Sequence, residues 1–491
     1  MYRISVTDAN NLVFSFDEMG LASYLGYCFL HVDSIRGTPL GGNPNEGSKM
    51  KSINRREFIK GSVGTATSFV LLLPGKVRGA NDKVMIGVMG LGGRGTYLAE
   101  QFAKRPDAEI AYLCDADTRR FARARKIVEE AQHKSPKLVQ DFRRILDDGS
   151  VDALINATPD HWHALGTIMA CQAGKDVYVE KPLAHNIWEG RKMVEAARKN
   201  SRVVQVGMQS RSAPYVHKAR QYIQSGKLGD IHLVRVFNMM QHPRQRNHPE
   251  QPVPEGFDYD LWCGPAPKLP YNPSRQWLNQ WEYSCGPIAG DAVHQLDLAR
   301  YLLNDVPYPK TVCHFGRVDA LLDGRQTPDT QLAVFEYEKF SLLLEAALWT
   351  PYMTKTPMEL RDLDRFPDWP FNGTRVEVLG TSGFMYFGRH GDGWQTYDSD
   401  GKLVNSEYGR QADKEHQDNF IDCIRTRNRP IADVEIGHYS VLLCHLANIS
   451  YRVGNQKLEF DGQAESFRNS AEANKYLKRQ YRQPWVVPDE V

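Results

Sequence analysis

The segment at residues 84–95, VMIGVMGLGGRG, constrains the fold of this chain more than any other. Its apolar first half is typical of a buried parallel strand. Gly90, Gly92 and Gly95 follow in the order G-x-G-x-x-G, and we expect a helix to begin at about Thr96. Backbone N–H groups and the helix dipole at such an N-terminus both favour an anion. The segment predicts a dinucleotide site, although three glycines alone fit a surface turn equally well.

An acidic residue lies at the separation that dinucleotide sites require. A second apolar run, residues 109–114, ends at Asp115, where a carboxylate would bind the ribose hydroxyls of adenosine. The same carboxylate would repel a 2′-phosphate, which favours NAD over NADP. Arg119, Arg120 and Arg123 follow closely and keep NADP possible. The alternative role for Asp115 is the N-cap of a helix.

Composition excludes several functional classes. The chain has 491 residues, enough for two or three domains, with 41% apolar and 24% charged residues. The net charge of +2 and the lack of a long basic run give no indication of nucleic-acid binding. No apolar run in the sequence reaches the roughly 18 residues of a membrane span. The eight cysteines are scattered without a C-x-x-C pair, so we expect neither a metal site nor a disulfide framework.

Residues 50–80 resemble a bacterial export signal of the twin-arginine type. Four basic residues precede an apolar stretch at residues 61–73: Lys51, Arg55, Arg56 and Lys60. An amphipathic helix is the alternative. Because such a signal belongs at the N-terminus, we expect Met50 to be the natural start and residues 1–49 to be a non-native upstream extension or disordered. The protein is then expected to be periplasmic, either released by cleavage or anchored by its signal.

Residues 81–208 alternate between strand and helix patterns with short connections, which predicts a Rossmann domain with a doubly wound parallel sheet. Two of its strands end in polar motifs, TPDHWH at residues 158–163 and EKP at residues 180–182. Ligands bind at the carboxyl ends of such strands. Lys181, in the second motif, is a candidate proton donor or acceptor if burial or a nearby cation lowers its pKa, with a surface lysine as the alternative.

Residues 209–485 predict a second domain of α+β type. Six segments alternate apolar and polar residues: 231–239, 312–318, 330–337, 341–349, 375–379 and 384–387. This pattern indicates a largely antiparallel open sheet with one solvated or oligomer-forming face. The predicted fold class is therefore α/β, with a Rossmann domain followed by this α+β domain.

The second domain also contains a long aromatic segment and a polar helix. Residues 241–288 are rich in His, Pro, Arg, Trp and Tyr and lack periodicity, as in a functional loop. Their rings would suit stacking on a sugar, and a packed structural loop is the alternative. The next helix carries Asp291, His294 and Asp297 three residues apart, on one face. This trio could line one site; a metal centre is the weaker interpretation, because no further ligands accompany it.

Four motifs, in their order and spacing, resemble the Gfo/Idh/MocA family of oxidoreductases, which includes glucose–fructose oxidoreductase and inositol dehydrogenase. They are GLGGRG (90–95), CDAD (114–117), NATPDHWH (156–163) and VYVEKP (177–182). The resemblance extends over about residues 82–485. The residues that it implies for cofactor binding are Gly90, Gly92, Gly93, Arg94, Gly95, Asp115, Thr158, Pro159, His163, Glu180, Lys181 and Gln209.

The resemblance also implies the residues near the reacting carbon. Lys181 matches the family's catalytic lysine, and Pro182 matches a proline that typically follows a cis bond. His294 matches a histidine that acts near the reacting carbon. Asp291 is its implied partner, but it lies three residues before the histidine, where the family has four. Asp297 is therefore an alternative orienting carboxylate.

These features predict an NAD(P)-dependent oxidoreductase that moves a hydride between a sugar or polyol carbon and the nicotinamide. Lys181 and His294 would handle the proton of the substrate hydroxyl. An exported enzyme has no nicotinamide pool to draw on, so we expect the nucleotide to be tightly held. One alternative is an NAD-dependent glycosidase or lyase that oxidises a sugar hydroxyl transiently; another is a non-catalytic sugar-binding protein. The resemblance also implies a homo-oligomer formed through the C-terminal sheet.

Overall fold

The computed structural model describes residues 3–8, 11–15, 83–245, 249–273 and 277–491. The chain divides into two units, Met1–Lys76 and Val77–Val491. In the first unit, β1 (Arg3–Asp8) pairs antiparallel with β2 (Asn11–Ser15), within the predicted upstream extension. The predicted export signal at residues 50–80 lies outside the described residues.

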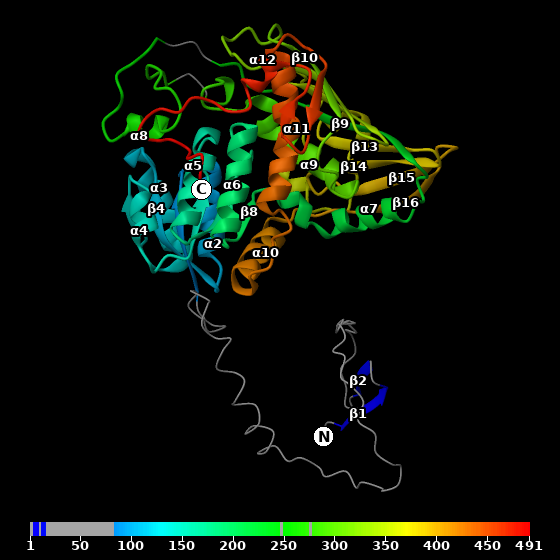
Figure 1. Cartoon of the computed structure of the whole chain (residues 1–491), viewed down its shortest axis with the longest axis horizontal. Coiled ribbons are helices and arrows are strands. Elements are labelled where there is room, and N and C mark those ends of the chain that lie inside the picture. The colour runs from blue at the N-terminus through cyan, green and yellow to red at the C-terminus, as the bar shows by residue number, and fades with distance from the viewer. Residues whose placement is uncertain (1–2, 9–10, 16–82, 246–248, 274–276) are drawn as a thin grey trace, which may run out of the picture. The chain divides into compact units, whose positions relative to one another are not determined.

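A six-stranded parallel sheet begins the second unit (Figure 1). Its strands are β3 (Val84–Met89), β4 (Ala108–Cys114), β5 (Lys137–Val139), β6 (Ala153–Asn156), β7 (Asp176–Val179) and β8 (Val204–Val206). The connecting helices are α2 (Gly93–Ala103), α3 (Phe121–Gln132), α4 (Arg143–Asp147), α5 (Asp160–Gln172) and α6 (Ile187–Lys199). The order β5-β4-β3-β6-β7-β8 confirms the predicted doubly wound sheet. Strand order reverses between β3 and β6, which opens a crevice at their carboxyl ends.

A ten-stranded sheet forms the second layer, in the order β16-β15-β14-β13-β9-β12-β11-β10-β17-β18. The strands that the sequence predicts are β9 (Ile231–Met239), β10 (Thr311–Arg317), β11 (Thr330–Glu336), β12 (Ser341–Ala347), β13 (Arg375–Gly380) and β14 (Gly383–Gly388). Four further strands had not been predicted: β15 (Trp394–Asp398), β16 (Leu403–Glu407), β17 (Leu458–Asp461) and β18 (Ser466–Phe467). Among the described strands of this sheet, only β9 and β12 pair in parallel, which confirms the largely antiparallel prediction.

Helices cover one face of this second sheet and leave the other open (Figure 1). The helices are α7 (Pro214–Gln224), α9 (Val293–Leu302) and α11 (Val434–Arg452). In β11, Ala333 and Phe335 are buried, whereas Leu332 and Val334 are exposed. Alternate residues of a strand point to opposite faces, so the open face carries apolar side chains.

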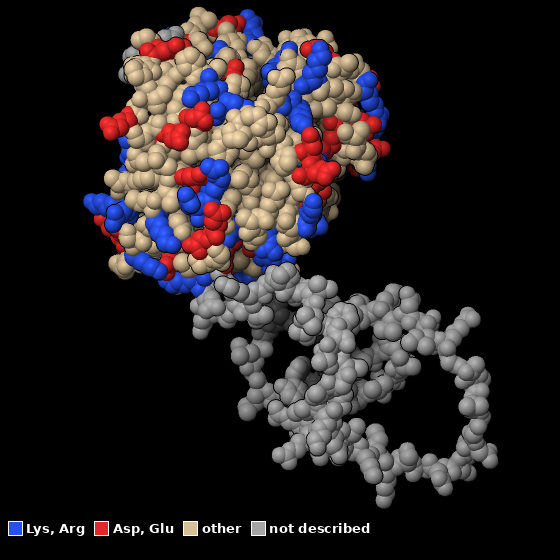
Figure 2. All heavy atoms as spheres, turned by 60° about the vertical axis from the view of Figure 1, so that its left-hand side comes forward, with Lys and Arg blue, Asp and Glu red and all other residues tan. Residues whose placement is uncertain are grey.

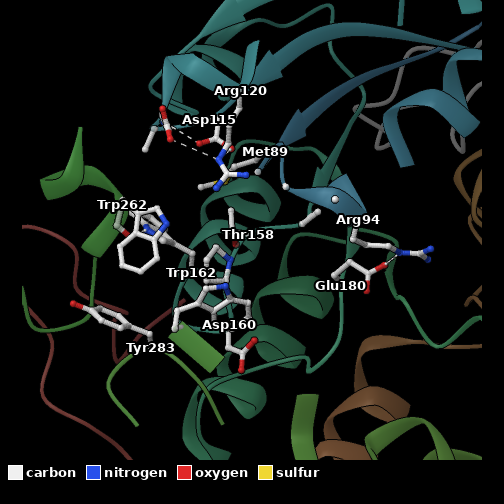
Figure 3. A pocket seen from close by; sticks show the side chains of 18 of the residues that line it. Met89, Arg94, Asp115, Arg120, Thr158, Asp160, Trp162, Glu180, Trp262 and Tyr283 are labelled. Carbon is white, nitrogen blue, oxygen red and sulfur yellow. Dashed lines mark hydrogen bonds and ion pairs between the residues drawn. The ribbon is translucent and has the colours of Figure 1, made fainter. Parts of the chain in front are cut away.

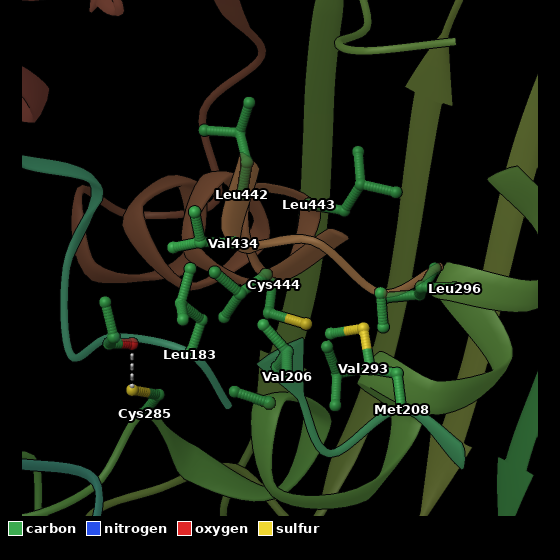
Figure 4. Close-up of a cluster of buried hydrophobic side chains, with 14 of the residues drawn as sticks. Leu183, Val206, Met208, Cys285, Val293, Leu296, Val434, Leu442, Leu443 and Cys444 are labelled. Atoms are coloured by element: carbon green, nitrogen blue, oxygen red, sulfur yellow. Dashed lines mark hydrogen bonds between the residues drawn. The ribbon is translucent and has the colours of Figure 1, made fainter. Parts of the chain in front are cut away.

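One hydrophobic cluster joins the two sheets (Figure 4). It combines Leu183 and Val206 from the Rossmann domain with Val293 and Leu443 from helices of the second domain, all fully buried. Because protein interiors are close-packed, such a shared core holds the two domains as one body. The crevice between them therefore has fixed walls.

Helix α10 (Asp413–Thr426) comes late in the sequence but packs on the Rossmann sheet. The ring of Phe420 lies edge-on to Phe102 and Tyr178, with centroids 6.3 and 5.7 Å apart. Arg427, just beyond the helix, forms an ion pair with Asp176 at 2.7 Å. The domain boundary at residue 208 stays a prediction from the sequence. Helix α10, although it lies beyond that boundary, packs on the Rossmann domain. Two further short α-helices among the described residues are α8 (Tyr259–Cys263) and α12 (Ala471–Asn474).

Positive and negative side chains are interspersed over the face drawn in Figure 2. This mixture agrees with the small net charge of the chain. None of the helices that the structure describes is both long and apolar enough for a membrane span.

Candidate functional site

A cavity of ≈ 770 Å³ lies at the carboxyl ends of the Rossmann strands. It brings together residues from the glycine turn, the TPDHWH and EKP motifs, the aromatic segment and α9. Figure 3 shows Asp115 and Arg120 at one side of it, Arg94 and Glu180 at another, and Thr158 between them. The motifs that are far apart in the sequence therefore line a single site.

The glycine turn has the geometry of a pyrophosphate cradle. Gly90 has φ +91°, and a Cβ atom there would lie 2.7 Å from the carbonyl oxygen of Ala157. A Cβ at Gly95 would lie 1.8 Å from the Gly90 carbonyl oxygen, so only glycine allows α2 to pack so closely. At Gly93, in contrast, no atom lies within 4 Å of such a Cβ, which leaves room above the helix N-terminus for an anion.

The start of α2 corrects one prediction. We expected the helix to begin at about Thr96, but it begins at Gly93, with Gly92 as its N-cap. The N–H of Thr96 already donates to the carbonyl of Gly92 at 3.0 Å. Glycine has low intrinsic helix propensity, and the residue pattern therefore contained no sign that the turn itself is helical.

Asp115 lies at the end of β4, where both of its carboxylate oxygens accept backbone hydrogen bonds. Leu91 N–H donates at 2.7 Å and Asp117 N–H donates at 2.9 Å. Burial raises the pKa of Asp115 from its ordinary value. The N-cap of the following 3-10 turn is Asp117, not Asp115, which removes the alternative role considered for Asp115. Arg120 lies 3.8 Å from this carboxylate and lines the cavity.

Glu180 and Arg94 form an ion pair on the wall of the cavity. Arg94 Nε donates to Glu180 Oε1 at 2.7 Å, and its Nη1 donates to Asp413 of α10 at 3.1 Å. Burial disfavours the charged form of Glu180, but the Arg94 charge lowers its pKa, so the carboxylate stays ionised. The amide of Gln209 lies between Arg94 and the carbonyl of Gly207. All three predicted cofactor residues therefore belong to one network.

Thr158 and Pro159 line the cavity, but His163 does not. His163 is 1% exposed, and its two ring nitrogens lie 2.8 Å from the carbonyl oxygen of Thr158 and 2.6 Å from that of Pro182. It thus bridges the backbones of the TPDHWH and EKP motifs from behind. This differs from the expected position beside the cofactor. The Lys181–Pro182 bond is cis, as the resemblance implies.

Lys181 and His294 face the same cavity. The ammonium of Lys181 donates a hydrogen bond to the carbonyl oxygen of Gly290. His294 is 5% exposed, and its Nδ1 has no hydrogen-bond partner among the described residues. Burial, followed by the charges of Arg389 and Lys181, holds the pKa of His294 well below its usual range. The imidazole is therefore neutral near pH 7.

Asp291 does not form the predicted pair with His294. It lies in a π-helical turn, Ile288–Ala292, before α9, which changes its direction relative to the helix face that the sequence suggested. Its carboxylate instead forms ion pairs with Lys355 Nζ at 2.8 Å and Arg389 Nη1 at 2.9 Å. Burial opposes ionisation, but the charges of Arg389 and Lys355 hold the pKa of Asp291 well below its usual range.

Asp297 lies outside the site as well. Its carboxylate accepts from Arg211 Nη2 and from Ser440 Oγ, both at 2.7 Å. The three residues predicted to share one face therefore lie in different surroundings. His294 lines the cavity, Asp291 forms ion pairs with two cations, and Asp297 is buried in the core. No cluster of three or more potential metal ligands occurs in the part of the chain that the structure describes.

Arg389 is a site residue that the sequence did not indicate. It follows β14 and lines the cavity with His294 and Lys181. No motif surrounds it, and its distance in sequence from the other residues hides its position. Only the pairing of β14 with β13 and β15 brings it to the cavity.

Residues 256–271, which we call the strap, extend from the second domain over the side of the crevice where Asp115 lies. Thr118 N–H donates to the carbonyl of Gly256, and Asp258 N–H donates to that of Ala116, both at 2.9 Å. The strap residues that line the cavity are Phe257, Tyr259, Leu261, Trp262 and Tyr271. Near the C-terminus, Arg482 Nη2 and Nε donate to the carbonyls of Asp260 and Gly264, at 2.6 and 3.1 Å. The C-terminal segment thus stabilises the position of the strap through these hydrogen bonds.

The sequence matches one family over most of its length. Residues 84–208 match the oxidoreductase family model with an NAD-binding Rossmann fold (GFO_IDH_MocA), and residues 220–455 match its C-terminal alpha/beta domain. Over 311 residues, the chain is 25% identical to a scyllo-inositol 2-dehydrogenase (NAD(+)) of Bacillus subtilis, covering 62% of this chain and 74% of that protein.

Other similar proteins are matched over shorter segments. The chain is 30% identical over 171 residues to "Glycosyl hydrolase family 109 protein 2" of Shewanella sp. (strain ANA-3), covering 30% of this chain and 38% of that protein. A match to an uncharacterized oxidoreductase of Streptococcus pneumoniae, 28% identical, covers 49% of this chain and 58% of that protein. Among solved structures, a levoglucosan dehydrogenase in complex with NADH and levoglucosan has a TM-score of 0.58 at 19% identity, covering 77% of this chain and 99% of that one.

Proposed function

Because the chain belongs to the Gfo/Idh/MocA family of oxidoreductases, we propose that it transfers a hydride between a sugar or polyol carbon and a tightly held nicotinamide nucleotide. The observation that supports this most strongly is the cavity, in which Lys181 and His294 lie with the glycine turn and Asp115. The cofactor, when bound, supplies the hydride chemistry.

The residues that would hold NAD fit that role. The open space at Gly93 leaves the N-terminus of α2 accessible to the pyrophosphate. Asp115 lies where the adenosine ribose would bind, and its charge disfavours a 2′-phosphate. Thr158, Pro159 and Glu180 would contact the nicotinamide ribose. Arg119 and Arg120 also line the cavity, so NADP remains the second candidate.

Lys181 and His294 would divide the proton handling. A neutral imidazole accepts a proton from the substrate hydroxyl as that carbon is oxidised. The Lys181 ammonium, oriented by the Gly290 carbonyl, donates a hydrogen bond to the same hydroxyl oxygen and stabilises charge that develops there. The Asp291 carboxylate fixes Arg389 and Lys355 beside them and acts as a positioning residue.

The contacts of the strap are consistent with a nucleotide that stays bound between catalytic cycles. Its backbone hydrogen bonds to Thr118 and Ala116 lie on the side of the cavity where Asp115 would bind the adenosine ribose, and Arg482 donates hydrogen bonds to the strap. Release of a dinucleotide would require these contacts to open. We also propose export with the nucleotide already loaded, on the basis of the signal-like residues 50–80.

A second candidate function shares the same site. The Shewanella relative is named a family 109 glycosyl hydrolase, and transient oxidation of a sugar hydroxyl followed by elimination would use the same lysine, histidine and retained nucleotide. To separate the two, the purified protein is incubated without added NAD, either with free sugars and polyols or with nitrophenyl glycosides. A net change in nicotinamide absorbance with a free sugar supports the oxidoreductase. Release of nitrophenol with no net change supports the hydrolase.

The open face of the second sheet is the proposed contact between copies of the chain. Phe315 of β10 is directly opposite Leu332 of β11, and Val334 lies next to them. Their exposed fractions are 56%, 46% and 37%. Clusters of exposed apolar side chains favour association, and a sheet face of this kind suits a second copy of itself.

A further inference from the structure

Arg389 lines the cavity and uses only one of its three guanidinium nitrogens in hydrogen bonds to described residues. Its Nη1 donates to Asp291 Oδ1 at 2.9 Å and to Gln295 Oε1 at 3.2 Å. Within the described residues, Nε and Nη2 have no acceptor, although the side chain is only 9% exposed. Nε and Nη2 of a guanidinium form one planar fork that matches the two oxygens of a carboxylate. Among the described residues, Nη1 of Arg389 thus has protein acceptors, whereas Nε and Nη2 can still donate to a ligand.

The backbone at Arg389 is also fixed in place. The hydroxyl of Tyr215 donates to the carbonyls of Gly388 and Arg389, at 2.9 and 3.1 Å. Ion pairing with Asp291 also orients the guanidinium. A side chain fixed in this way loses little conformational entropy when a ligand binds.

Cations outnumber carboxylates around Asp291, and Arg361 and Asp392, which also lie near Arg389, offset each other. Lys181, Lys355 and Arg389 all lie close enough to Asp291 to lower its pKa, and Asp291 is the carboxylate that pairs with two of them. Glu180 and Asp160 also lie near Lys181, but each has another partner. Glu180 pairs with Arg94, and Asp160 accepts from the N–H of Cys285 at 2.9 Å.

The nearby histidines do not add to the positive charge. Burial and the surrounding cations hold the pKa values of His294 and His390 well below their usual range. Their side chains are therefore neutral near pH 7. The single charge of Asp291 is shared between Arg389 and Lys355. Because buried cations are costly unless their charge is balanced, a ligand that brings a second negative charge to the fork would be favoured.

We propose that Arg389 binds a carboxylate of the substrate, so that the preferred substrates are sugar acids such as uronic or aldonic acids. This rests on the proposed oxidoreductase or hydrolase function and specifies the substrate class of that site. The carboxylate accepts two hydrogen bonds from Nε and Nη2 of Arg389. His294 and Lys181, which line the same cavity, remain free to act on a hydroxyl elsewhere in the sugar.

The test compares matched pairs of acids and neutral sugars on the nucleotide-loaded protein. The pairs are glucuronate with glucose and galacturonate with galactose, with glucose 6-phosphate as a third kind of anion. We expect at least one acid to exceed its neutral partner in kcat/KM by roughly 10- to 100-fold, the range of a charge-assisted hydrogen bond. Arg389→Met should remove most of this ratio, and Arg389→Lys, which keeps the charge but not the fork, should restore only part of it. Arg410→Met, at an exposed arginine paired with Asp364, is the control and should leave the ratio unchanged.

A binding measurement separates failure of this proposal from failure of the proposed function. Calorimetric titration of the same ligands reports affinity whether or not any of them turns over. Tighter binding of the acid than of its neutral partner, lost in Arg389→Met, supports the proposal even if no substrate reacts. Equal affinities for acid and neutral sugar, an unchanged ratio in Arg389→Met, or a preference for the sugar phosphate would each overturn the carboxylate assignment.

Discussion

The side-chain ammonium of Lys181 donates a hydrogen bond to the backbone carbonyl of Gly290, in the π-helical turn before α9. This bond connects the EKP motif of the Rossmann domain to the helix that carries His294. It therefore fixes the two candidate acid–base groups relative to each other across the domain interface. Because the acceptor is a backbone carbonyl, which every residue type has, no sequence motif could indicate this bond.

Replacement of Lys181 by alanine should abolish turnover while the nucleotide stays bound. Loss of a positioned proton-transfer group typically lowers kcat by about 10²- to 10⁴-fold. The matched control is Lys192→Ala, which removes a lysine that pairs with Glu195 on α6, away from the cavity. Steady-state kinetics and the nucleotide content of each variant provide the comparison. Normal turnover in Lys181→Ala would refute the assignment of this residue.

Gly95→Ala should weaken both the fold and nucleotide binding. The added Cβ would lie 1.8 Å from the carbonyl oxygen of Gly90, and overpacking of this kind costs about 1–3 kcal/mol. At Gly149, no atom lies within 4 Å of the position that a Cβ would take, so Gly149→Ala is the matched control. Thermal unfolding with and without NAD reports both effects. An unchanged melting temperature and nucleotide content in Gly95→Ala would show that α2 does not pack as described.

Arg482→Ala should release the nucleotide faster without changing the chemistry. The substitution removes hydrogen bonds to the carbonyls of Asp260 and Gly264 and an ion pair with the Asp260 carboxylate. Arg468→Ala, at an exposed arginine paired with Asp461, serves as the control. The measured quantity is the dissociation rate of the nucleotide after dilution into a scavenging dehydrogenase. If both variants retain the nucleotide equally, the strap has no part in its retention.

Acidification from pH 7.5 to 5 should destabilise the protein. Burial lowers the pKa of His161 to about 3, that of His416 to about 4 and that of His445 to about 3. In the unfolded chain these groups bind protons below about pH 6.5, whereas in the folded chain they stay neutral. Their contribution to the free energy of unfolding is therefore fully present above pH 6.5. It decreases as the pH falls toward 3–4, by about 1.4 kcal/mol per histidine for each pH unit. A melting temperature that stays constant or rises over this range would contradict the burial of these neutral rings.

Phe315→Glu together with Leu332→Lys should dissociate the proposed oligomer. Charged groups on the open sheet face would have to be desolvated at the contact. Met358→Glu places a charge at a residue that is 70% exposed and outside the strands, and it should leave the assembly unchanged. Light scattering during size-exclusion chromatography gives the mass of each variant. A wild-type mass of one chain would exclude this contact.

The sequence predicted the fold well where structure is local. Strand β7 ends directly before the EKP motif, as predicted, because an apolar run gives way there to charged residues. Gly90 and Gly95 indicate the turn because its backbone geometry requires glycine. The sequence failed where a contact depends on tertiary packing. The spacing of Asp291, His294 and Asp297 suggested one face, but a π-helical turn redirects Asp291, and Arg211 binds Asp297. Arg389 and the packing of α10 on the first sheet carry no local pattern and appear only when distant segments meet.

The proposed function depends most directly on a nicotinamide nucleotide that stays bound to the protein during purification. The decisive measurement is to purify the protein without added cofactor, denature it and identify any released nucleotide by chromatography and mass spectrometry. We predict NAD, in an amount close to one per chain. Absence of NAD and NADP, both as purified and after soaking with each, would contradict the assignment of this cavity as the cofactor site of an oxidoreductase.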